Sequence, residues 1–172
     1  VVRLPARVDY TLPNGLKVTL VPFGTVPKTS IVVALGTGAI AEGSRPGLAS
    51  MTADLMKQGA AGGDAAQLFR QAADFGGALG ITAGYASFSV GIDVLSEHGP
   101  EAAGLVAKII RHPTLPAGEL PRLKADAKRA LAVGRSQQQS LAAHALSRQL
   151  FGDDPRGHTL EDQDVEAITA AD

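Results

Sequence analysis

The 172-residue chain contains no cysteine and no tryptophan, and aromatic residues make up only 4% of it. The absence of cysteine excludes disulfides, thiolate metal sites and a cysteine nucleophile. The scarcity of aromatic rings argues against a platform for stacking nucleic-acid bases. The net charge of -1 provides no electrostatic footprint for nucleic acid or an anionic membrane. We therefore predict no nucleic-acid partner.

Long apolar runs are also missing, since none approaches the roughly 18 residues needed to span a bilayer. Hydrophobic residues make up 45% and charged residues 19% of the chain, as in ordinary globular proteins. We expect a soluble chain without a membrane span. The length fits one domain with a sizeable core, or most of one larger domain.

The chain contains segments with the two-residue alternation of strands and segments with the spacing of helices. Two β-prone runs, 8–12 and 16–21, flank the turn residues Pro13-Asn14-Gly15 and predict a hairpin. Further strands are predicted at 30–35, at 85–94, where apolar residues alternate with small or polar ones, and in the segment just before it. Helices are predicted from Pro46 to about Gly59, and over 64–75, 100–110, 119–135 and 140–151. Interleaved helices and antiparallel strands predict an α+β fold, a largely antiparallel sheet with helices on one face.

The helix predicted from Pro46 carries Leu48, Met51, Leu55 and Met56 on one apolar stripe. The segment around Gly47-Leu48-Ala49 resembles the insulinase and mitochondrial processing peptidase family (pitrilysin type). In that family Gly-Leu-Ala leads into an inverted zinc motif, His-x-x-Glu-His. That chemistry needs two imidazoles one helical turn apart and an adjacent carboxylate as base.

The motif positions read Ser50, Ala53 and Asp54 in this chain. A hydroxyl, a methyl group and a single carboxylate cannot replace two imidazoles and a base. The third zinc ligand of active relatives is a Glu, which the alignment places at Ala130. The resemblance therefore implies that this chain has no catalytic, metal or cofactor-binding residue.

The resemblance covers nearly the whole chain through short segments whose order and spacing are more specific than any one of them. They are 12–18, 36–42, 76–77, 111–116, 119–124 and 150–155. The resemblance implies a metallopeptidase half-domain of the processing-peptidase type. Thr169 is predicted to be the N-cap of a helix that would follow it, so we expect residues 1–172 to be a single domain that is incomplete at its C-terminus.

The resemblance implies a non-catalytic domain or subunit of a zinc metallopeptidase assembly. Its expected partners are an active insulinase-like domain or subunit, which would hold the zinc, and unfolded peptide substrate. The similar bacterial proteins are mostly exported, which implies the periplasm. Two alternatives stay open: an active metallopeptidase with unorthodox ligands, and a scaffold subunit with no role in peptide cleavage.

Four other patterns have a simple structural explanation beside a functional one. Ser50 and Asp54 share a helical face that could contact substrate, although a solvated face or a domain interface is the default. His98, His112, His144 and His158 have no metal-ligand spacing, and a Ser-His-Asp triad has no supporting motif. Gly36 to Ala41 matches a dinucleotide fingerprint but continues into a loop. Basic residues on the helix 119–135 predict a solvated face; they are Arg122, Lys124, Lys128, Arg129 and Arg135.

Overall fold

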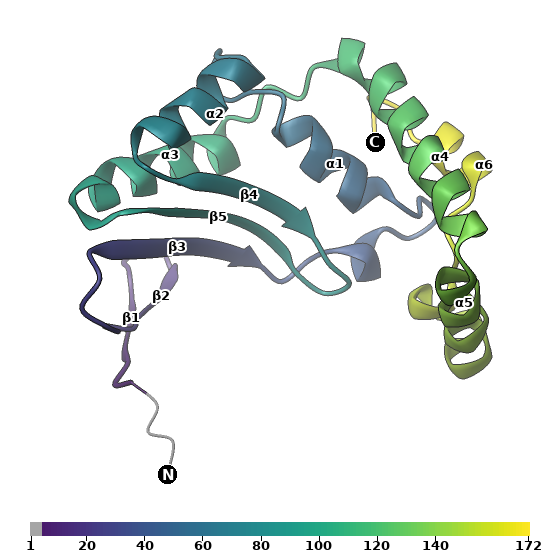
Figure 1. Ribbon diagram of the computed structural model, residues 1–172, viewed down its shortest axis with the longest axis horizontal. Helices are drawn as coiled ribbons and strands as arrows, with labels where there is room; N and C mark the ends of the chain where they lie inside the picture. Colours follow the sequence, from purple (N-terminus) through teal and green to yellow (C-terminus); the bar gives the residue numbers. More distant parts are fainter. Residues whose placement is uncertain (1–4) are drawn as a thin grey trace.

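The computed structural model describes residues 5–172 (Figure 1). Within this range the strands are β1 (Val8–Thr11), β2 (Lys17–Leu20), β3 (Lys28–Leu35), β4 (Ala78–Ala83) and β5 (Phe88–Leu95). The α-helices are α1 (Leu48–Met56), α2 (Ala65–Asp74), α3 (Gly99–Arg111), α4 (Leu120–Ser136), α5 (Gln138–Phe151) and α6 (Asp162–Ala167). Short 3-10 helices occupy Ala39–Ala41, Ser96–His98, Ala117–Glu119 and Pro155–Gly157. The predicted α+β fold, with antiparallel strands and helices against the sheet, is confirmed.

The N-terminal hairpin forms a two-stranded sheet of its own, in register from Val8 opposite Leu20 to Thr11 opposite Lys17. Its turn is closed by a 2.8 Å hydrogen bond from the Gly15 N–H to the Leu12 carbonyl. Gly15 has a φ of +85°, a conformation that favours glycine. The predicted hairpin is therefore confirmed, with strands shorter than the β-prone runs.

The main sheet has the order β3-β5-β4, with β5 in the centre and both pairings antiparallel. The apolar residues that alternate along β5, from Phe88 to Val94, are all buried. They pack with α2 and α3 in the larger of two hydrophobic clusters, here called the sheet cluster. Its most buried members, Ala102 and Ile109, lie on α3. The capping box predicted at Asp64 and Gln67 opens α2 as expected.

Helix α1 begins at Leu48 and not at Pro46, because Gly47 ahead of it has a left-handed backbone with φ +87°. The Glu42 carboxylate accepts hydrogen bonds from the backbone N–H groups of Gly47 (2.9 Å) and Ala49 (2.8 Å). An acidic side chain is favourable at this end of a helix, where N–H groups lack intrahelical partners. Glu42 therefore fixes the start of the motif helix.

The apolar residues of α1 do not form the single stripe that the sequence predicts. Met56 packs into the sheet cluster together with Ala53. Met51 belongs to a second cluster, the helical cluster, against which Leu48 and Leu55 also pack. The remaining buried members of the helical cluster are Leu120, Leu123, Val165 and Ile168. Helix α1 therefore bridges two cores.

Helix α6 has no counterpart among the predicted helices, because it is short and half of its six residues are acidic. Arg122, Arg129 and Arg135 are exposed, as predicted for a solvated face of α4, but some of the basic side chains also contact α6. Lys124 donates a 2.8 Å hydrogen bond to the Glu166 carbonyl, and Lys128 pairs with the Glu166 carboxylate. Arg135 pairs with Asp162 at 2.8 Å. Three of the five basic residues thus hold α6 against α4.

The last residues of the chain fold back toward α1. The Asp172 carboxylate accepts hydrogen bonds from the N–H (2.7 Å) and hydroxyl (2.9 Å) of Thr169, and it pairs with Arg45 at 3.1 Å. The Thr169 hydroxyl in turn accepts a 3.3 Å bond from the Ala171 N–H. These bonds link the segment after α6 to the loop before α1.

Candidate functional site

Helix α1 presents the three motif positions in different directions. Ser50 and Asp54 are four residues apart and so share one face of the helix. Ala53 points the other way and is only 3% exposed. The Asp54 carboxylate accepts a 2.7 Å hydrogen bond from Lys57 Nζ, which makes it half of a local ion pair. The side chains of the three positions therefore do not converge on one point.

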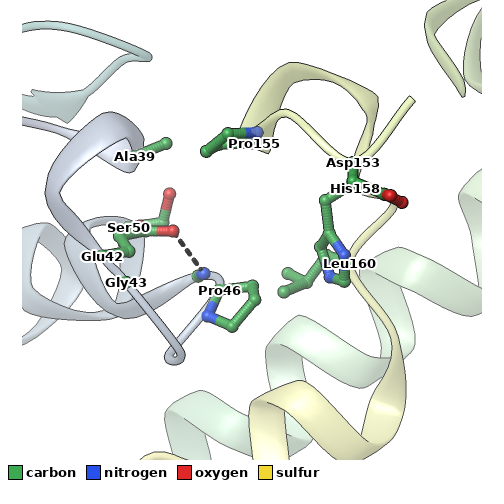
Figure 2. Close-up of a pocket in the computed structure, with 10 residues that line it drawn as sticks. Ala39, Glu42, Gly43, Pro46, Ser50, Asp153, Pro155, His158 and Leu160 are labelled. Atoms are coloured by element: carbon green, nitrogen blue, oxygen red, sulfur yellow. Dashed lines mark hydrogen bonds between the residues drawn. The ribbon is translucent and has the colours of Figure 1, made fainter. Parts of the chain in front are cut away.

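Ser50 opens into a cavity of about 330 Å³ beside the start of α1. Figure 2 shows Glu42, Pro46 and Ser50 along one wall and Pro155, His158 and Leu160 along the other. The first wall comes from the 3-10 helix Ala39–Ala41, the following loop and α1. The second wall comes from the segment that joins α5 to α6. The cavity thus lies between segments that are about a hundred residues apart in the sequence.

Most polar groups of this cavity are already engaged inside the protein. Both Glu42 oxygens accept backbone hydrogen bonds from the start of α1. His158 Nε2 lies 3.0 Å from the Asp164 carboxylate, which also accepts a 2.8 Å bond from the Glu161 N–H. The structure shows no hydrogen bond to the Ser50 hydroxyl from any residue between 5 and 172. Ser50 and the exposed Asp153, whose carboxylate lies 3.7 Å from Arg148, are therefore the polar side chains of this cavity best placed to meet a ligand.

A compact polar cluster anchors the second wall to the main sheet. Arg156 donates from its backbone N–H (2.9 Å) and Nε (2.8 Å) to the Asp154 carboxylate. These bonds lower the pKa of Asp154 to about 2. The Arg156 guanidinium lies 4.5 Å from the centre of the Phe151 ring and 5.5 Å from that of Tyr85. Because Tyr85 belongs to the β4–β5 turn, the cluster fixes the position of the wall.

The helix that carries Ala130 packs on the helix that carries the other motif positions. Met51 of α1 shares the helical cluster with Leu123 of α4. Arg122 on α4 donates a 3.2 Å hydrogen bond to the Gln58 side chain just beyond α1. Ala130 is exposed and brings no ligand atom.

Zinc sites in proteins use imidazole, thiolate or carboxylate ligands, usually four in all with any bound water. Ser50, Ala53, Asp54 and Ala130 supply one carboxylate among them, and it is paired with Lys57. Across the part of the chain that the structure describes, no three His, Cys, Asp or Glu side chains gather in a way that could hold a metal ion. The residues present do not fit a zinc ion.

The fold is shared with solved structures of peptidases. The peptidase M16 inactive domain from Pseudomonas fluorescens superposes with a TM-score of 0.86 and 25% sequence identity over 96% of this chain. The chain has the insulinase-like, or M16, fold. The expected family resemblance is thereby confirmed at the level of the fold.

Two further solved proteases share the fold at lower identity. A protease from Helicobacter pylori has a TM-score of 0.88 and 17% identity over 97% of this chain. The periplasmic protease PqqL from Escherichia coli has a TM-score of 0.75 and 18% identity over 98% of it. This chain spans 41% of the length of the P. fluorescens and H. pylori structures and 20% of the length of PqqL. No family model matches the chain, and a search of curated proteins finds no match.

Several residues that shape this cavity are not among those singled out from the sequence. Glu42 could have been found, since an acidic residue shortly before a helix is a start signal. The pair His158 and Asp164 and the cluster around Arg156 have no comparable local signal, because their partners are brought together by turns and by tertiary contact. No helix in residues 5–172 is both long enough and apolar enough to cross a bilayer.

Proposed function

We propose that this chain is a non-catalytic domain of an insulinase-type zinc peptidase assembly, in which it shapes the substrate chamber and binds unfolded peptide for an active partner half. The observation that supports this proposal most directly is that helix α1 is retained without zinc ligands. This helix keeps its place between the sheet and α4, whereas Ser50, Ala53, Asp54 and Ala130 supply no zinc ligand set. The likeness to the inactive domain from P. fluorescens supports this role. The zinc of the assembly then belongs to the partner.

Peptide binding in this proposal uses strand addition, in which an extended segment pairs with the edge of a sheet. In an antiparallel ladder, successive residues turn their backbone N–H and C=O groups to opposite sides. The Ser96 N–H bonds to the Pro27 carbonyl, and the Gly84 N–H bonds to the Ser87 carbonyl. The same alternation, continued along the β3–β5 and β4–β5 pairings, shows which residues of β3 and β4 turn their N–H and C=O groups away from β5. These groups lie at the two outer edges of the sheet. They are those of Ser30, Val32 and Ala34 on β3, and of Leu79, Ile81 and Ala83 on β4.

The two edges differ in access. Ser30, Val32 and Ala34 are all exposed, and the Val32 side chain lies open on the surface. On β4, Ile81 is buried, and Leu79 and Ala83 are half-buried where α1 packs against the strand. Within residues 5–172 no strand pairs with the outer edge of β3. We therefore place the peptide on β3.

The test is backbone amide exchange followed by NMR, with and without an unstructured peptide. Strand addition on β3 predicts slower exchange at Ser30, Val32 and Ala34, and little change at Thr29, Ile31 and Val33, whose groups already face β5. Matched peptides methylated at every second backbone nitrogen provide the control, since only the set that removes the N–H groups facing β3 should lose binding. Slowing at Leu79, Ile81 and Ala83 would move the site to β4. No slowing at either edge would overturn the peptide-binding role.

The catalytic alternative is tested by metal analysis and an activity assay of the pure chain. The proposal predicts no stoichiometric zinc and no cleavage of unstructured peptides, with or without added zinc. Tightly held zinc and chelator-sensitive cleavage lost in Ser50→Ala or Asp54→Ala would replace the proposal with an active peptidase. The likeness to a periplasmic protease also supports a periplasmic site of action, which fractionation of the native host tests directly.

A further inference from the structure

The turn of the N-terminal hairpin carries the sequence Asn14-Gly15. We propose that this dipeptide is a site of spontaneous deamidation, controlled by the opening of the β1–β2 hairpin. Asn14 is the only asparagine of the chain. All residues from Leu12 to Leu16 are exposed, so that water reaches the turn. The inference is independent of the proposed peptide-binding role.

The chemistry needs only this dipeptide and water. The Gly15 backbone nitrogen loses its proton and attacks the side-chain carbonyl carbon (Cγ) of Asn14. A bond forms between these two atoms, the Cγ–Nδ2 bond breaks, and ammonia leaves with the proton, which gives a cyclic succinimide. Water then opens the ring at one of its two carbonyls and yields aspartate or isoaspartate. Gly15 favours the attack because it has no Cβ to shield its nitrogen.

In the closed hairpin, hydrogen bonds occupy both reacting groups and prevent the attack. The Gly15 N–H donates a 2.8 Å hydrogen bond to the Leu12 carbonyl. The Asn14 side-chain oxygen accepts a 3.1 Å hydrogen bond from the Leu16 N–H. The nitrogen must leave the first bond before it can be deprotonated, and the amide must leave the second before it can rotate toward that nitrogen. The turn geometry therefore slows the reaction while the hairpin is closed.

Opening of this hairpin requires little free energy. It has two strands of four residues and pairs with no other strand in residues 5–172. None of its residues is buried, and the apolar face formed by Val8, Tyr10 and Leu20 is open to solvent. Isolated two-stranded hairpins are marginally stable in water. Local opening, without unfolding of the sheet cluster, therefore sets the reaction rate.

The reaction would make closure of the hairpin difficult. Isoaspartate routes the main chain through the side chain of residue 14 and lengthens it by one methylene. The Gly15 N–H then no longer meets the Leu12 carbonyl, and the register from Val8 opposite Leu20 loses its turn. Either product adds one negative charge to a chain whose net charge is -1. Deamidation therefore marks chains whose hairpin has opened.

The experiment ages the intact chain in mildly alkaline buffer, in native conditions and in urea. Intact mass and peptide mapping follow residue 14, and an isoaspartyl methyltransferase with labelled methyl donor counts isoaspartate. We expect urea to speed the reaction by about tenfold or more, which corresponds to about 1.4 kcal/mol of opening free energy. Tyr10→Ala, which removes a cross-strand contact with Val18, should speed the native reaction while circular dichroism of the rest of the chain stays unchanged.

The control variant Asn14→Gln keeps a side-chain amide but moves it one methylene away, and it should show almost no product. Absence of product at residue 14 in urea would show that the dipeptide is not a deamidation site. Equal rates in native buffer and urea, or no acceleration in Tyr10→Ala, would overturn control by the hairpin.

Discussion

The two hydrophobic clusters of this protein are held together in different ways. The sheet cluster contains β5 and parts of α1, α2, α3 and β4, and its buried members are almost wholly aliphatic. The helical cluster has only five buried residues, from α1, α4 and the region of α6. Ion pairs surround it, between Lys128 and Glu166, Arg135 and Asp162, and Arg45 and Asp172. The sheet cluster is therefore stabilised mainly by apolar burial, whereas the helical cluster is also stabilised by ion pairs around it.

This difference gives the motif helix two environments. Ala53 and Met56 face the sheet cluster, whereas Met51 faces the helical cluster. Ser50 and Asp54 belong to neither and remain free to vary without loss of a core contact. The family position that carries a base in active relatives is thus a structural position in this chain. The two positions that carry imidazoles in those relatives stay at the surface.

The largest expected effect tests the comparison with two like substitutions. Ile109 on α3 and Ile168 after α6 are both buried, at 0% and 2% exposure. We expect Ile109→Ala to lower the free energy of unfolding by about 4 kcal/mol and Ile168→Ala by about 2 kcal/mol. The smaller cluster can collapse more easily around a lost side chain. Urea unfolding measures both, and equal losses would show that the two cores are equally rigid.

Charge burial on α1 is the next largest effect. Ala53→Glu places a carboxylate at a nearly inaccessible position, and we expect a loss of about 2 to 3 kcal/mol at neutral pH. Burial raises the pKa of such a group, so the penalty shrinks as the pH falls below that raised pKa. Ser50→Glu on the exposed face is the matched control. A stable Ala53→Glu chain would mean that α1 separates readily from the sheet cluster.

The contrast between the clusters also explains how far the sequence predicts the structure. Alternation along β5 identifies Phe88, Val90, Ile92 and Val94 as one buried face, because strand periodicity alone decides which side is apolar. The capping box at Asp64 and the turn at Gly15 are equally local. These signals determine most of the sheet half.

The helical half depends on partners that are distant in sequence. Lys124 resembles a solvated lysine until α6 brings Glu166 to it, and its side chain is then only 16% exposed. Helix α6 is too short and too acidic to predict from propensity. In the candidate site, Ser50 and Asp54 follow from the motif, whereas the wall with His158 requires the tertiary fold.

A surface metal site sharpens the comparison, because its ligands avoid both cores. Ser50→His, Asp54→His and Ala130→Glu together should bind about one zinc ion through three protein ligands and water. Ala53 is left unchanged for two reasons. The residue at this position in active relatives acts as a base and does not bind the zinc, and the position is buried. We expect the triple variant to bind zinc at least about tenfold more tightly than the double variant with Ala130, a difference of about 1.4 kcal/mol. Calorimetry that finds equal affinities would place the third ligand position away from Ala130.

The smallest expected effect concerns the polar tie between the two halves. Arg156 lowers the pKa of Asp154 from 3.8 to about 2, and Tyr85 connects this pair to the β4–β5 turn. A carboxyl group with a lowered pKa stabilises the folded state above its unfolded pKa, and this contribution disappears as the pH falls through the folded value. The ring signals of Tyr85 and Phe151 in NMR spectra should therefore hold steady down to about pH 3 and change with a midpoint near pH 2. Asp154→Asn should show the altered signals at every pH. A midpoint near the ordinary value of 3.8 in the unmodified chain would mean that Arg156 does not hold Asp154 in solution.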